Sequence, residues 1–91
     1  MSEPYMLPPK LDLPAATPLV QDLKSRLGDD LVLDASEVTQ IGALCTQVIA
    51  SAALSLHRAG HSARIIHMTD RVVEQLGHLG FSPESLTEVA E

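Results

Sequence analysis

Residues 31–52 read LVLDASEVTQIGALCTQVIASA, and this stretch leads from a strand into a helix. Leu31-Val32-Leu33 is a short apolar run, which predicts a strand buried on both faces. A helix is predicted to begin near Gly42, and its spacing gives an inward stripe formed by Cys45, Val48, Ile49, Ala52 and Leu56. A strand that passes directly into a helix is the building unit of an α/β fold.

The same alternation of strands and helices continues on both sides of this stretch. Residues 11–27 predict a first helix, and residues 63–68 predict the next strand. A further helix is predicted over residues 69–80, and Ser82-Pro83-Glu84 is a start signal for a terminal helix. This order predicts an α/β fold in which helices pack against a small, mostly parallel sheet with right-handed crossovers.

The chain is long enough for one small domain. It has 91 residues, and a second core is not expected at this length. Residues 1–10 contain three prolines; Tyr5-Met6-Leu7 allows one short edge strand, which Pro8 and Pro9 prevent from continuing. We therefore expect an N-terminal segment over residues 1–10 and the α/β domain over residues 11–91.

The composition excludes several classes of partner. Acidic residues outnumber basic ones, giving a formal net charge of -6, and the six basic residues are scattered. No basic stripe is present to neutralise phosphates, so neither nucleic acid nor an anionic membrane surface is an expected partner. The uncharged run at residues 38–57 is too polar for a membrane span. With one cysteine and no signal-peptide pattern, the chain is expected in the cytoplasm.

Few side chains are arranged for chemistry. Gly60 interrupts the closest pair of histidines, so neither a metal nor another cofactor is expected. Cys45 is either a thiolate whose pKa is lowered by the helix N-terminus or, as we favour, a buried small side chain. Asp34 and Ser36 could support acid–hydroxyl chemistry, but no histidine is placed to serve as a base, and turn stabilisation is the favoured interpretation. We therefore expect no catalytic residue.

The outward side of the helix after Gly42 is expected to be flat and uncharged. The positions predicted to point outward are Ala43, Thr46, Gln47, Ala50, Leu54 and His57. Small uncharged side chains let another backbone approach closely, and no charge must be desolvated on docking. The alternative is that the N-terminal segment or another helix of the domain covers part of this face. The residues expected to contact a partner are Asp34, Ser36, Thr39, Gln40, Gly42, Ala43, Thr46, Gln47 and Ala50.

Residues 31–52, followed by a turn at Gly60 and the strand at 63–68, resemble the STAS domain, a family that joins sulphate transporters and anti-sigma-factor antagonists. The motif consists of the apolar strand, the Asp34-Ala35-Ser36 turn and the hydrophobic positions Val38 and Ile41 before the helix. The similarity extends from about Leu11 to Phe81. It implies a STAS-like α/β domain.

The start of the helix departs from the pattern of anti-sigma-factor antagonists. In those proteins it opens with an acidic residue and two serines, and the partner kinase phosphorylates the second serine. This chain has Gly42-Ala43-Leu44 instead, so Leu44 stands at the phosphoserine position and cannot accept a phosphoryl group. The phosphorylation switch of the family is therefore expected to be absent.

The variant glycine-small-x-Cys-x-Gln-Val resembles the short STAS proteins encoded with alphaproteobacterial chemotaxis genes, the CheS-like group. This resemblance implies a non-catalytic module that binds the histidine kinase CheA and tunes phosphate flow to or from the response regulator CheY. Other members of the family imply alternatives: an anti-sigma factor as partner, the ATPase of a lipid-transport system with an MlaB-like subunit, or a carrier of a lipid or nucleotide.

Overall fold

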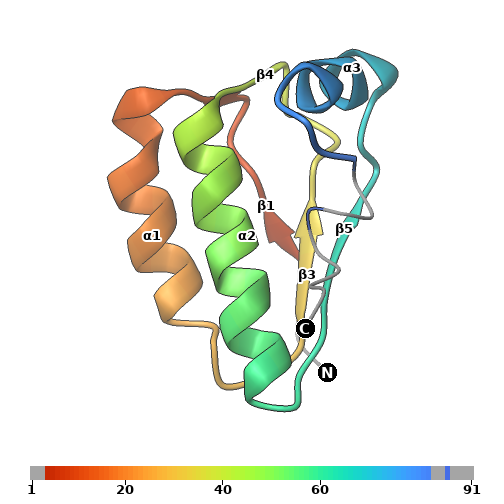
Figure 1. Cartoon of the computed structure of the whole chain (residues 1–91). Helices are drawn as coiled ribbons and strands as arrows, with labels where there is room; N and C mark the ends of the chain where they lie inside the picture. The colour runs from red at the N-terminus through yellow and green to blue at the C-terminus, as the bar shows by residue number, and fades with distance from the viewer. Residues whose placement is uncertain (1–3, 83–85, 87–91) are drawn as a thin grey trace.

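Three short parallel strands form the main sheet, with β3 at its centre (Figure 1). The computed structural model describes residues 4–82 and Leu86. Strands β1 (Tyr5–Met6), β3 (Leu31–Asp34) and β5 (Ala63–Ile66) lie in the order β1-β3-β5. Both pairings are parallel, so all three strands end at the same edge of the sheet. The expected edge strand near the N-terminus and the mostly parallel sheet are confirmed.

A second pair of strands connects the N-terminal region to the start of the second long helix. Strand β2 (Lys10–Leu11) pairs in parallel with β4 (Gln40–Ile41). The sequence did not predict this pairing, because each strand is only two residues long and the partners lie far apart in the chain. Their pairing places the segment after β1 beside the segment that enters the helix.

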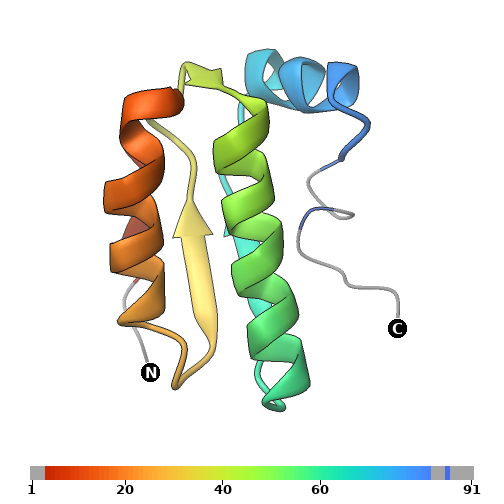
Figure 2. The same cartoon turned by 60° about the vertical axis from the view of Figure 1, so that its left-hand side comes forward.

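Two helices lie side by side on one face of the main sheet, and a third crosses its end (Figures 1 and 2). The short 3-10 helix η1 (Leu13–Ala15) leads into α1 (Ala16–Lys24), and α2 (Ala43–Arg58) packs beside α1. Helix α3 (Asp70–His78) contacts β4. Within the residues described, no helix has both the length and the apolarity needed to cross a membrane.

The first helix is shorter than expected. Residues 10–11 form β2 rather than helix, and the regular α-helix begins only at Ala16. Pro14 lies in the 3-10 turn and Pro18 in the first turn of α1, where a missing amide donor costs little. Irregular turns, not helix, occupy residues 25–28. The terminal helix predicted from Ser82-Pro83-Glu84 lies mostly outside the described residues, although Leu86 is helical and buried.

Burial of β3 on both faces was expected, and this expectation is wrong. Leu31 and Leu33 are buried, but Val32 and Asp34, which alternate with them, are only half-buried. Both α1 and α2 lie on the same face of the sheet (Figure 2), so the strand has one covered face and one more open face. The core between sheet and helices is aliphatic, as the composition predicts, with Leu11, Leu56 and Leu76 fully buried.

Candidate docking surface

The segment that enters α2 is attached to the N-terminal region by backbone hydrogen bonds. The Thr39 amide donates to the Pro9 carbonyl at 2.8 Å, and the Gly42 amide donates to the Leu11 carbonyl at 2.9 Å. The Thr39 hydroxyl also donates to the Pro9 carbonyl at 3.1 Å. The β2–β4 pair therefore positions the loop that precedes the predicted docking helix.

Gln75 of α3 holds the other side of the same segment. The neighbouring amides of this strand point toward β2, so the Ile41 amide points away from it and donates to Gln75 Oε1 at 2.9 Å. Gln75 Nε2 donates to the Thr39 carbonyl at 3.1 Å. The sequence analysis missed Gln75. The signal was available, because a glutamine between Val72 and Leu76 lies at the border of the buried face of α3.

Asp34 stabilises a turn, as the favoured interpretation predicted. Its Oδ1 accepts a hydrogen bond from the Ser36 amide at 2.9 Å, and this bond is the main cause that holds the pKa of the Asp34 carboxyl below its usual range. The Ser36 side chain itself is exposed. A carboxylate that already serves the turn has less capacity to act on a substrate.

No histidine was expected to be placed as a base for Asp34 and Ser36, yet a histidine does lie beside Asp34. His67 Nδ1 is 3.2 Å from Asp34 Oδ2, because β5 ends beside β3 and His67 directly follows β5. The contact further lowers the pKa of Asp34. His67 has a φ of 60°, a backbone region that residues other than glycine rarely adopt. The pair joins the ends of two neighbouring strands, and the imidazole contacts the carboxylate rather than a hydroxyl nucleophile.

Gly42 is the N-cap residue of α2, and the backbone that lies close to it belongs to the same chain. Its φ of -108° and ψ of 173° are open to any residue. A Cβ at this position would lie 3.5 Å from the Leu11 carbonyl oxygen, an ordinary van der Waals contact. The backbone conformation at position 42 therefore does not require glycine. Gly42 lies against β2 and is partly exposed to solvent.

Thr46 does not point outward, so that prediction is wrong. Its side chain is fully buried, and its hydroxyl donates to the Gly42 carbonyl one turn earlier at 2.8 Å. Ala50, also expected outside, is half-buried and packs against the core. Val48, expected inside, is half-buried. Because α2 packs against both α1 and the sheet, its buried face is wider than the single stripe that was predicted. This face is also shifted around the helix, so that it includes Thr46.

Cys45 is a buried thiol, and the thiolate alternative is wrong. Its side chain is 1% exposed, and Sγ lies 3.3 Å from the Asp12 carbonyl oxygen, to which it donates. Burial raises the pKa of the Cys45 thiol, and the nearby Asp12 carboxylate raises it further. The thiol is therefore neutral at physiological pH and serves as a small core side chain.

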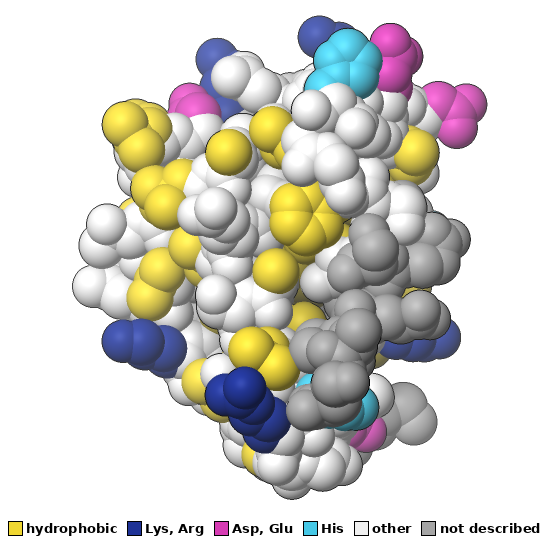
Figure 3. All heavy atoms as spheres, viewed as in Figure 1, with side chains coloured by type: hydrophobic (Ala, Val, Ile, Leu, Met, Phe, Trp, Pro, Cys, Tyr) yellow, Lys and Arg dark blue, Asp and Glu magenta, His cyan; other side chains and the backbone are white. Residues whose placement is uncertain are grey.

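The exposed part of the predicted set, together with the neighbouring Leu44, forms a smaller surface than expected, here called the α2 shoulder. It comprises Ser36, Thr39, Gln40, Ala43, Leu44 and Gln47, all of which are exposed. Glu37 is the charged side chain in the same loop. In Figure 3 the centre of this view is mostly white and yellow, and the charged side chains lie mainly toward its periphery. The α2 shoulder offers hydroxyl, amide and apolar groups.

Among the residues described, no three His, Cys, Asp or Glu side chains gather as a metal ion would need. Comparison of the chain with family models, curated proteins and solved structures gave no match. The site geometry and the sequence motifs are therefore the basis for assigning a function.

Proposed function

We propose that this chain is a STAS-like docking module of the short, chemotaxis-associated CheS-like type, which acts without catalysis by binding the histidine kinase CheA. The small parallel α/β architecture supports a STAS-like fold. The Asp34-Ala35-Ser36 turn follows a central strand, and the helix that begins at Ala43 has the position that this resemblance implies.

The observation that carries this proposal is the exposed side of α2. From Ala43 to Leu56 this helix exposes only uncharged side chains. Helix α3 shows the contrast within the same protein, because its exposed positions include Asp70, Arg71 and Glu74. An ordinary solvated helix resembles α3, whereas a protein interface is depleted of charge at its centre. The α2 shoulder is therefore the part of the described surface that we assign to the partner.

In this proposal, Leu44 prevents phosphorylation from regulating docking at this position. It stands at the position of the phosphorylated serine in anti-sigma-factor antagonists, and its side chain is 44% exposed. An exposed leucine adds apolar contact area but cannot be phosphorylated. Docking through this helix is therefore constitutive with respect to phosphorylation at this position, and the partner contact is modest, on the order of 1,200 Å² or less.

The proposal is tested by placing a charge at Ala43, which is exposed and makes no side-chain hydrogen bond. Both Ala43→Glu and Ala43→Lys should weaken the binding of CheA from the same organism, because either charge is buried unpaired in the contact. We expect a cost of about 3 kcal/mol, or roughly two orders of magnitude in Kd. Isothermal titration calorimetry measures the affinity, and circular dichroism checks that both variants remain folded.

Ala59→Glu is the matched control, because Ala59 is exposed at the opposite end of α2. This variant should bind CheA like the wild type. Unchanged affinity of both Ala43 variants would remove the α2 shoulder from the interface. The wild type could fail to bind CheA and bind tightly to an anti-sigma factor or to the ATPase of a lipid transporter. This result would show that the docking role is correct and that the partner is not CheA.

A further inference from the structure

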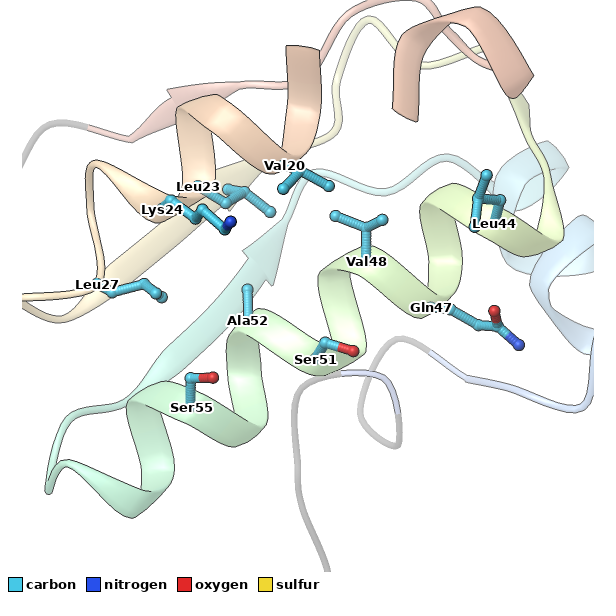
Figure 4. A pocket seen from close by; sticks show the side chains of 10 residues that line it. All are labelled: Val20, Leu23, Lys24, Leu27, Leu44, Gln47, Val48, Ser51, Ala52 and Ser55. Carbon is cyan, nitrogen blue, oxygen red and sulfur yellow. The ribbon is translucent and has the colours of Figure 1, made fainter. Parts of the chain in front are cut away.

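A groove lies between α1 and α2, beside the α2 shoulder and mostly outside it. Its volume is about 360 Å³, within the range of small-molecule sites. It extends along α2 from Leu44 to Ser55, roughly 16 Å of helix rise. Figure 4 shows α1 and the following turn on one side and α2 on the other, with Val20 and Val48 facing each other across the gap.

The walls of the groove are apolar, and its polar groups are few. The apolar lining residues are Val20, Leu23, Leu27, Leu44, Val48 and Ala52. The polar ones are Gln47, Ser51 and Ser55 on α2 and Lys24 on α1. Most of a bound molecule would therefore contact aliphatic carbon, and its polar part would have to lie near one of these four side chains.

Among the described residues that line the groove, Lys24 is the one with a charged side chain. It is exposed at the end of α1, and its side chain reaches toward the gap between the helices (Figure 4). It takes part in neither the His61–Asp30 ion pair nor the His67–Asp34 ion pair. A cation beside an apolar groove, in a chain of net charge -6, is complementary to an apolar molecule that carries one anionic group.

We propose that this groove binds a single-chain amphiphile with an anionic headgroup, such as a medium-chain carboxylate. The hydrocarbon tail lies between Val20 and Val48, and the headgroup lies at Lys24, where Ser51 and Ser55 offer hydroxyl donors. This inference goes beyond the proposed docking function, because it needs no protein partner.

The structure also sets the size of the expected effects. Each methylene removed from the tail should weaken binding by up to about fourfold, and by less where the tail stays in contact with solvent. Loss of an exposed ion pair should weaken binding by roughly 1.5-fold to fivefold. Tail length should therefore dominate the affinity, and the charge of the headgroup should decide between ligands with equal tails.

The experiment titrates the full chain with sodium dodecanoate below its micelle concentration, and with decanoate, dodecanol and dodecyltrimethylammonium under the same conditions. Calorimetry gives the affinity, and amide chemical shifts in a two-dimensional NMR spectrum give the location. We expect saturable binding of dodecanoate at one site, with shifts confined to residues 20–27 and 44–55. Decanoate should bind more weakly than dodecanoate, and among the three ligands with a twelve-carbon tail the cationic amphiphile should bind least.

Lys24→Gln should weaken dodecanoate binding by up to fivefold and leave dodecanol binding unchanged, and Lys24→Glu should weaken dodecanoate further. Lys10→Gln is the matched control, because Lys10 is an exposed lysine of β2 outside the groove. These substitutions change exposed side chains, so we expect folding to remain intact. Each of three results would overturn the proposal. The first is equal affinity for all headgroups, and the second is a set of chemical-shift changes outside the groove. The third is a chain that binds no dodecanoate, including one that forms a dimer instead.

Discussion

The bridge made by Gln75 allows a prediction about what holds the docking loop in place. Gln75→Ala removes the acceptor of the Ile41 amide and the donor to the Thr39 carbonyl. The Ile41 amide is partly buried and loses the partner that α3 provides, whereas the Thr39 carbonyl is exposed and can bind water. A partly buried donor without a partner costs about 1–3 kcal/mol, so most of the loss comes from Ile41.

That cost is large for a domain of this size. A chain of 91 residues has a free energy of unfolding of roughly 5–14 kcal/mol. A loss of about 1–3 kcal/mol should lower the Tm by roughly 5–20 °C. Gln75→Glu should show a smaller effect, because a carboxylate still accepts from the Ile41 amide but cannot donate to the Thr39 carbonyl.

Urea denaturation followed by circular dichroism measures the stability, and hydrogen exchange measures the Ile41 amide directly. Glu74→Ala is the control, because Glu74 is exposed on the same helix and belongs to neither of these hydrogen bonds. The reasoning is refuted if Gln75→Ala is as stable as Glu74→Ala and if the Ile41 amide exchanges at the wild-type rate. Faster exchange confined to residues 39–41 supports a local role in positioning the loop.

Three other side chains lead to sharp predictions. Thr46→Val removes the hydrogen bond to the Gly42 carbonyl and should lower the free energy of unfolding, measured by urea denaturation, by about 1 kcal/mol. The affinity for CheA should not change, and a loss of affinity would show that Thr46 contributes to the interface. The lowered pKa of Asp34 means that its carboxylate stabilises the folded state above the unfolded pKa, and this contribution disappears as pH falls through the folded value. Asp34→Asn should therefore lose less stability than the wild type between about pH 6 and about pH 2, as measured by denaturation at each pH; an equal loss would contradict a role for Asp34. Cys45 should react with a thiol reagent at about pH 8 far more slowly in the folded chain than in urea, because it is buried and its pKa is raised; equal rates would show an accessible thiol.

Local patterns in the sequence predicted most elements of the fold. The strand at Leu31 to Leu33, the helix beginning after Gly42 and the helix predicted within residues 69–80 are all present. In the last of these, the Thr69 hydroxyl accepts from the Val72 amide. Each of these features depends on residues within about four positions of one another. Such features can be inferred because side-chain spacing and backbone capping act over one turn of helix or a few residues of strand.

The arrangement of the site was decided by contacts between distant parts of the chain. Gln75 bonds to Ile41 across 34 positions, and His67 lies beside Asp34 across 33 positions. Neither contact leaves a periodic signal, because strand order and helix docking determine which distant residues meet. The sequence by itself determined an α/β domain with a helix that carries no charged side chain from Ala43 to Leu56. Only the tertiary structure decided that Thr46 is buried and that a groove separates α1 from α2, because both depend on how α2 is rotated against its neighbours.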